Sequence, residues 1–234
     1  MFRSLLLASL LTASSVPTSA WADLPAKVSS KIPKSRLGKG NWEYLETKKD
    51  IRLSRKLVGD GGLFAVRGET VVKSPIGKVI SAVYDETRWT EWTKIMGAKL
   101  LKLHSDNQKT VYQSFDMPMV LSDRDVIYTF GVWETGETTF ISGWTNPAVV
   151  VNEPKTIGVR MNLVAGDWYL TPTKDGHTHV ILEVLMDPKG ILPAFFVNIA
   201  QRDYPVTTLV GLKKQAAKPG VKTFPRASLT KLSP

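Results

Sequence analysis

The order of strand-like and helical segments is the feature that most limits how this chain can fold. Alternating apolar and polar residues, bounded by turn residues, predict about eight or nine strands. A long segment of helical periodicity follows them, from Leu192 to about Ala217. The predicted strands lie near residues 63–72, 98–104, 108–117, 120–133, 138–145, 157–164, 167–172 and 178–186. Many antiparallel strands followed by one long helix are typical of an α+β domain whose curved sheet wraps the last helix.

Prolines mark both predicted helices. Ser74 is a suitable N-cap, Pro75 suits a first helical position, and apolar residues recur at helical spacing through residues 76–84. These signals predict a short helix of about three turns between the strands. Pro205 lies inside the long helix, two residues after Asp203. Because proline removes a backbone hydrogen bond, we expect a kink and a soft point there.

The two ends of the chain differ from its middle. Arg3, an apolar stretch and small residues up to Ala22 resemble the three zones of a secretory signal peptide, so we expect cleavage near Ala22 and a periplasmic or secreted protein. Segments rich in proline, glycine and basic residues predict arms outside the fold at both ends. The predicted divisions are 1–22 (signal peptide), 23–41 (N-terminal arm), 42–217 (folded domain) and 218–234 (basic C-terminal tail).

Composition narrows the classes of function. The chain has no cysteine, which excludes disulfides, thiolate metal sites and cysteine nucleophiles, and which together with export favours a bacterial periplasm. Its formal net charge is +10. Excess positive charge on an exported protein points to anionic lipid surfaces rather than to nucleic acid. Because the lysines are scattered, a basic protein that is merely soluble is an open alternative.

Motifs for catalysis, cofactors and metals are absent from the sequence. It contains no glycine-rich phosphate loop, no nucleophile elbow and no zinc-protease motif. His177 and His179 would share one face of a strand, but the sequence offers no third ligand. Asp123 and Asp125 flank an arginine and are more simply its partners than a general acid and base. We therefore predict no metal, no cofactor and no enzymatic activity.

One arginine lies on the apolar side of a predicted strand. In an extended chain Arg124 shares a face with Val126 and Tyr128, whereas Asp125 faces the other way. Burying an unpaired charge costs several kcal/mol. Arg124 must therefore be paired, reach an edge, or line a cavity that holds a polar group.

Several segments, in order, resemble the steroidogenic acute regulatory protein-related lipid transfer (START) domain in its exported bacterial branch. They are Gly-Leu-Phe-Ala-Val-Arg-Gly-Glu at 62–69, Trp-Thr-Glu-Trp at 89–92, Ser-Asp-Arg-Asp at 122–125, and Asp-Pro-Lys-Gly-Ile-Leu-Pro at 187–193 with Asn198 beyond it. The resemblance covers about residues 42–217. It implies a helix-grip fold, in which a nine-stranded curved sheet around a long C-terminal helix encloses a tunnel for one lipid.

The resemblance also gives Arg124 a role. In sterol-binding members the matching arginine points into the tunnel and pairs with an acid, but the position of that acid is Ala98 here. Arg124 is then left to pair with Asp116, Asp125 or Glu183, or to meet the ligand directly. An unpaired arginine in a cavity favours a phosphate or carboxylate headgroup over a sterol hydroxyl.

A mobile gate is implied by the same resemblance, formed by the last helix and the loop of residues 144–154. Consecutive valines in this loop are costly to expose, so we expect them to contact the helix, a ligand or a membrane, or to form a buried strand edge. The predicted gate residues are Trp144, Val149, Val150 and Val151. The predicted ligand-binding residues are Arg124, Asp125, Tyr112, Phe115, Tyr128, Met161, Trp168, Phe195, Phe196 and Ile199.

Taken together, the sequence predicts an exported, monomeric lipid-binding or lipid-transfer protein without catalytic activity. One amphipathic lipid, a phospholipid, fatty acid or sterol-like molecule, would lie in the tunnel with its polar head near Arg124. Transient docking on a membrane surface would load it, and no nucleic acid partner is expected. Two alternatives stay open: a helix-grip enzyme of the cyclase or hydrolase kind acting on a hydrophobic substrate, and an adaptor module with a filled core.

Overall fold

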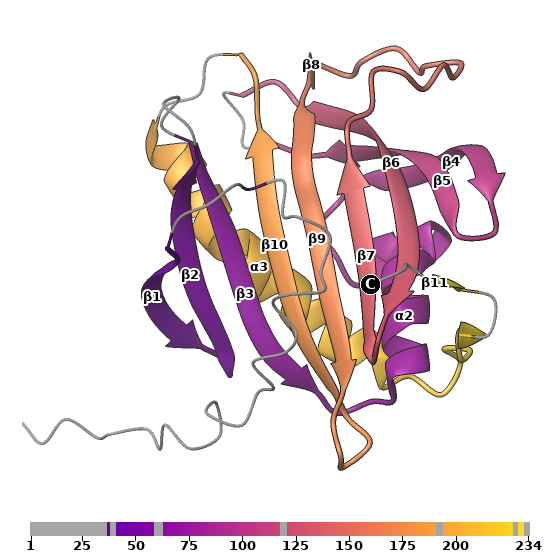
Figure 1. Ribbon diagram of the computed structural model, residues 1–234. Helices are drawn as coiled ribbons and strands as arrows, with labels where there is room; N and C mark the ends of the chain where they lie inside the picture. The colour runs from indigo at the N-terminus through magenta and orange to yellow at the C-terminus, as the bar shows by residue number, and fades with distance from the viewer. Residues whose placement is uncertain are drawn as a thin grey trace, which may run out of the picture. The chain divides into compact units, whose positions relative to one another are not determined.

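The fold is a curved sheet with a long helix packed against one face (Figure 1). The computed structural model describes Leu37 and residues 41–58, 63–117, 121–190, 194–226 and 229–231, with the backbone alone for 194–201 and 230–231. The strands are β1 (Glu43–Lys48), β2 (Ile51–Val58), β3 (Leu63–Val72), β4 (Gly97–Ser105), β5 (Gln108–Phe115), β6 (Arg124–Thr135), β7 (Thr138–Trp144), β8 (Val159–Arg160), β9 (Asn162–Pro172), β10 (Thr178–Asp187) and β11 (Thr230–Lys231). The helices are α2 (Ile76–Tyr84), the 3-10 helix η2 (Glu86–Glu91) and α3 (Ala194–Ala216).

Nine strands form one antiparallel path through the sheet. Their order is β1-β2-β3-β10-β9-β7-β6-β5-β4, so the hairpins from the two halves of the chain meet where β3 pairs with β10. The two short strands β8 and β11 lie off this path, and each pairs with β6 in parallel. This arrangement and the helix α3 confirm the predicted helix-grip α+β fold.

Some element boundaries differ from those predicted. The predicted strands 157–164 and 167–172 are not separated by a turn at Gly166. Gly166 pairs with Gly143 of β7 and Val184 of β10, so β9 continues through it. The strands β1 and β2 were not predicted, since charged residues interrupt their alternation. The N-cap of α2 is Pro75 without a side-chain hydrogen bond, and not Ser74, whose carbonyl accepts a bond from Thr178 instead.

The main core lies between the sheet and its helices. Tyr84, Trp89, Tyr128 and Phe130 form a set of stacked and edge-to-face rings in it. Burying each such ring stabilises the fold by about 1.5–3 kcal/mol. The helix α3 approaches the sheet most closely at Gly68, where an added Cβ would meet Leu209 Cδ1 at 2.7 Å. Gly68 therefore sets how closely α3 can lie against β3.

Both segments predicted to be arms outside the fold contribute to it. Beyond α3, Val221 and Leu229 are buried, and Phe224 packs edge-to-face on Tyr84. Before β1, Leu37 is buried in a small second cluster with Ala65, Ala165 and Leu185. The composition of these segments predicted arms because prolines and lysines surround the few apolar residues that pack. No helix in the described ranges is both long and apolar enough to cross a membrane.

Candidate functional site

Arg124 is the first residue of β6, and its side chain is buried on the inner face. It is 2% exposed and shares this face with the core residues Val126 and Tyr128, as the alternation predicts. Nη1 donates a hydrogen bond to the backbone oxygen of Ser122, whereas Nε has no partner in the described part of the chain. A buried guanidinium with an unused donor can bind an acceptor that the protein itself does not provide.

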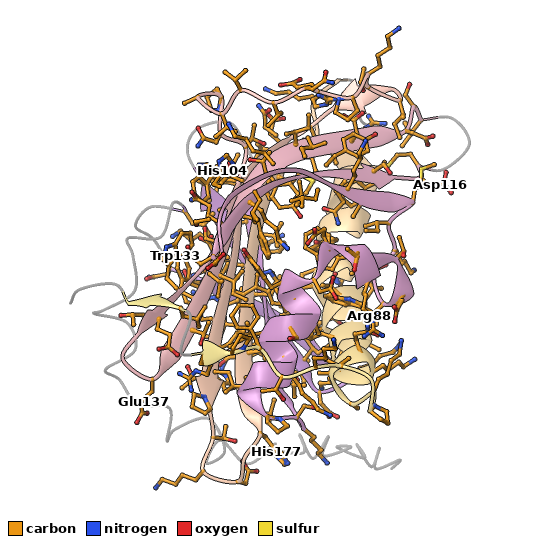
Figure 2. The ribbon with its side chains drawn as sticks, turned by 90° about the vertical axis from the view of Figure 1, so that its right-hand side faces the viewer. Arg88, His104, Asp116, Trp133, Glu137 and His177 are labelled. Carbon is orange, nitrogen blue, oxygen red and sulfur yellow. The ribbon has the colours of Figure 1, made fainter. Side chains whose placement is uncertain are left out.

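None of the three acids proposed from the sequence pairs with Arg124. Asp116 is exposed at the end of the strands (Figure 2). Asp125 and Glu183 point to the outer face of the sheet, where they pair with Arg160 and Arg67. Among the residues that the structure describes, Arg124 therefore has no counter-ion.

Three elements meet around the guanidinium. In the strand register Arg124 lies between Phe115 of β5 and Val159 of β8. Gly190, just before α3, completes the surroundings, since a Cβ built on it would lie 3.9 Å from Arg124 Nη2. Its φ of +65° is in the left-handed region, which favours glycine and brings the backbone this close. The site thus lies where the sheet, the loop before β8 and the start of α3 come together.

A small cavity of 50 Å³ lies between the sheet, η2 and α3, and it is not closed off from the solvent. It is lined by Val83, Trp89, Trp92, Thr93, Gln113, Tyr128, Phe130, Trp168, Tyr204 and Thr208. Tyr128 and Trp168 were predicted to line the tunnel, and both lie on this wall. Burial raises the pKa of Tyr128 and of Tyr204, so both phenols stay neutral at physiological pH.

Two more predicted wall residues also face inward. Met161 is 6% exposed and belongs to the core, and Phe115 is partly buried against it. Phe195, Phe196 and Ile199 lie on the first turns of α3, where the description is confined to the backbone. Their predicted contact with a ligand stays a prediction.

Tyr112 and Asp125 lie on the outer face of the sheet, so their predicted place in the tunnel wall is wrong. Tyr112 pairs in register with Ile127, and its hydroxyl lies 3.4 Å from Asp125 Oδ2. Side chains three residues apart in one strand point to opposite faces, and Phe115 is the inward one. The prediction failed because it placed Tyr112 and Phe115 on the same wall.

Asp125 anchors the loop that leads into β8. Arg160 Nε donates to Asp125 Oδ1, and the Ile157 N–H donates to Oδ2 at 3.0 Å. Arg160 also binds Glu153 Oε2 at 2.9 Å and the Pro154 carbonyl at 2.8 Å. Burial alone would raise the pKa of Asp125, but the bonds from Arg160 and Ile157 outweigh it and lower the pKa. No local sequence pattern predicts this anchor, because its donors lie more than 30 residues away.

The predicted gate valines differ in exposure. Val149 and Val151 are half-buried, as is Trp144 at the end of β7, whereas Val150 is 83% exposed. Ile157, further along the same loop, is 44% exposed. The loop therefore presents apolar side chains to the solvent next to the end of the sheet that holds Arg124.

Comparison with known proteins identifies a relative in sequence and several proteins of similar fold. No family model matches the sequence. An uncharacterized protein from Pseudomonas aeruginosa is 26% identical over 179 residues, which are 76% of this chain and 88% of that protein. The sequence comparison thus adds a bacterial relative without a described function.

Solved structures define the fold more closely. A STAR-related lipid transfer protein fragment from Xanthomonas axonopodis is 23% identical and superposes with a TM-score of 0.67, over 76% of this chain and 99% of that one. Human STARD10 is 18% identical with a TM-score of 0.67, over 78% and 75% of the two chains. Human StAR-related lipid transfer protein 5 is 17% identical with a TM-score of 0.68, over 77% and 88%. The class of fold is thus helix-grip, and within it this chain has the START-domain fold.

Proposed function

We propose that this protein is an exported lipid-binding or lipid-transfer protein that holds one amphipathic lipid with its polar head at Arg124. The observation that carries the proposal is the buried guanidinium, which has an unused Nε–H and no counter-ion within the described ranges. The names of the similar structures, which are lipid transfer proteins, support the same class of ligand. The signal-like residues 1–22 support export.

The unneutralised charge favours a headgroup that is itself an anion. Ala98 lies on the inner face of β4, opposite Gln113, so the position that holds an acid in sterol-binding members carries only a methyl group. A phosphate or carboxylate would supply the missing charge and could accept hydrogen bonds from the guanidinium in a bidentate manner. A sterol hydroxyl would leave the charge unpaired.

We propose that the core opens to load a lipid, because the cavity that the described residues line is small. A cavity of 50 Å³ has room for a water molecule or two, and not for an acyl chain. The loop with the exposed Val150 lies beside Arg124 and could contact a membrane while α3 moves away from the sheet. Excess positive charge would favour transient docking on an anionic surface.

We propose binding without catalysis. The titratable side chains on the described cavity wall are Tyr128 and Tyr204, whose pKa burial raises. Neither phenol can act as a general base near neutral pH. Incubation of the protein with ester-containing phospholipids should therefore give no hydrolysis products. If products form, and Arg124→Leu abolishes them, the alternative of a helix-grip enzyme is favoured.

Mass spectrometry under denaturing conditions tests binding. The protein purified in its folded state should release one anionic lipid per chain, and Arg124→Leu should reduce this occupancy or abolish the preference for an anionic head. Arg55→Leu is the matched control, because Arg55 is an exposed arginine paired with Glu43 at the far edge of the sheet. If Arg124→Leu releases the same lipid in the same amount, Arg124 does not bind the headgroup. If the wild-type protein never releases a lipid, the proposal of lipid transfer is rejected.

A further inference from the structure

A groove of 450 Å³ lies between α3, the segment after η2 and the turn between β1 and β2, and we call it the lysine groove. Its rim and floor include Lys49, Lys94, Lys214, Trp92, Val206 and Val210. These residues come from the turn between β1 and β2, the segment after η2, and the C-terminal half of α3.

The lysine groove is separate from the site at Arg124. Gly190 brings the segment before α3 next to Arg124, whereas Val210 lies 16 residues beyond Ala194, the first residue of α3. At 1.5 Å per residue this is about 24 Å along the helix. The lysines of the groove therefore lie far from Arg124 along the helix, although Trp92 lines both the groove and the inner cavity.

Close packing fixes the floor of the groove. An added Cβ on Gly211 would lie 1.9 Å from the Trp92 carbonyl oxygen, so α3 and the segment after η2 are in direct contact. Beside this contact, Val206, Val210 and the half-buried Trp92 provide apolar surface. The groove thus combines an apolar floor with a rim of charged residues.

The positive charge of the rim is not compensated. Lys49, Lys94 and Lys214 are exposed, and within the described ranges none of them makes an ion pair. Glu91 is the one acid that lines the groove, and it is already bound by Arg88 at 2.7 Å and by Lys218 at 2.9 Å (Figure 2, where Arg88 marks this side of α3). Three lysines from three different segments therefore give the groove a positive electrostatic potential.

Two buried polar atoms in the groove wall also lack partners. Gln215 is 1% exposed and donates its amide N–H to Glu91, but its Oε1 has no hydrogen bond in the described structure. The same holds for Trp92 Nε1. Of these two atoms only Trp92 Nε1 is a donor, so it alone suits an anionic ligand, whereas Gln215 Oε1 is an acceptor.

We propose that the lysine groove binds one anionic amphiphile. Its carboxylate or phosphate would lie among Lys49, Lys94 and Lys214, and a short apolar portion would cover Trp92, Val206 and Val210. A volume of 450 Å³ is in the range of sites for single small ligands. A flat membrane would contact the lysines but would leave the hollow empty, so the combination favours a single molecule.

Titration followed by NMR tests the proposal on the purified protein. The probes are decanoate and decyl phosphate below their micelle concentrations, with decanol and inorganic phosphate to separate the tail from the head. The indole N–H resonance of Trp92, assigned by its loss in Trp92→Phe, reports on the groove. We expect saturable shifts with both acidic amphiphiles and much weaker ones with decanol or phosphate alone.

Charge reversal locates the binding. Lys94→Glu/Lys214→Glu should weaken binding by about tenfold or more. The control Lys99→Glu/Lys102→Glu makes the same charge change on exposed lysines of β4 and should leave binding unchanged. All four substitutions are at exposed positions, and an unchanged thermal midpoint confirms that the variants fold.

Three outcomes would overturn the proposal. The first is unchanged affinity in Lys94→Glu/Lys214→Glu. The second is a loss of the Trp92 shift in Arg124→Leu, because Trp92 also lines the inner cavity and the signal would then come from the proposed lipid site. The third is binding only to phosphatidylglycerol vesicles, which would make the lysines a membrane contact. A persistent shift in Arg124→Leu supports the groove whatever becomes of the lipid site.

Discussion

Arg124 and Arg67 differ in how their charge is neutralised. Its guanidinium is buried, and within the described ranges no carboxylate pairs with it. Desolvation of a charge costs several kcal/mol when no partner repays it. Arg67 is the opposite case, because it pairs with Glu183 on the outer face and keeps a buried carboxylate satisfied.

This contrast predicts opposite effects of two arginine-to-leucine substitutions on stability. Arg124→Leu should leave the free energy of unfolding unchanged or raise it, since it removes an unpaired buried charge. Arg67→Leu should lower it by about 3 kcal/mol, since the buried Glu183 then loses its counter-ion and keeps only the hydrogen bond from the Tyr169 hydroxyl at 3.5 Å. Urea denaturation of the ligand-free proteins measures both. A loss of more than about 2 kcal/mol in Arg124→Leu would mean that Arg124 has a structural partner.

Among the elements, α3 depends on glycines where other segments touch it. Gly211→Ala would bring a methyl group 1.9 Å from the Trp92 carbonyl oxygen. Although alanine favours a helix, we expect a destabilisation of about 1–3 kcal/mol, because backbone atoms must move apart. Gly220→Ala is the control, since its added Cβ meets nothing within 4 Å. Thermal unfolding compares the two, and equal midpoints would contradict the close contact.

The loop before β8 should respond to pH through Asp125. Its pKa is lowered in the folded state, so its contribution is present above the unfolded-state value of about 3.9 and is lost as the pH falls through the folded value. Protection of the Ile157 amide against hydrogen exchange, corrected for intrinsic rates, should stay constant from pH 7 to about 4 and fall below that. If protection of the Ile157 amide is already lost at pH 6, a group other than Asp125 holds the loop.

Removing the charge of Asp125 should release the same loop at neutral pH. We expect Asp125→Asn to lower the local opening free energy at Ile157 by about 2 kcal/mol, because a charge-assisted bond from Arg160 is lost. Glu153→Gln is the control, since Glu153 is exposed and binds only the far end of Arg160. Equal exchange rates in both variants would show that Asp125 does not hold the loop.

Much of the fold follows from the sequence, whereas less of the site does. Alternation in β6 placed Arg124 on the inner face correctly, since the strand has no bulge between Arg124 and Thr135. The prediction for Tyr112 is wrong because residues 112 and 115 of β5 point to opposite faces, and Phe115 is the one that shares the face of Arg124. The Asp125–Arg160 anchor joins residues 35 apart, which no local pattern reveals. The lysine groove depends on how three elements pack and is likewise invisible in the sequence.

At the scale of the whole molecule, the START-domain fold places two positively charged sites at different points along α3. The site at Arg124 is buried near the start of the helix, and the lysine groove is open near its end. A net charge of +10 makes both compatible with anionic ligands. The proposed lipid site depends on Arg124, whose Nε–H has no partner in the described ranges.

NMR of the arginine Nε–H groups tests whether Arg124 binds the headgroup. In ¹⁵N-labelled protein the Arg124 resonance is identified by its absence in Arg124→Leu. Adding one equivalent of the lipid that the purified protein releases should shift this resonance, because a phosphate or carboxylate oxygen then accepts its hydrogen bond. A lipid that binds stoichiometrically while the Arg124 resonance stays in place would contradict the account.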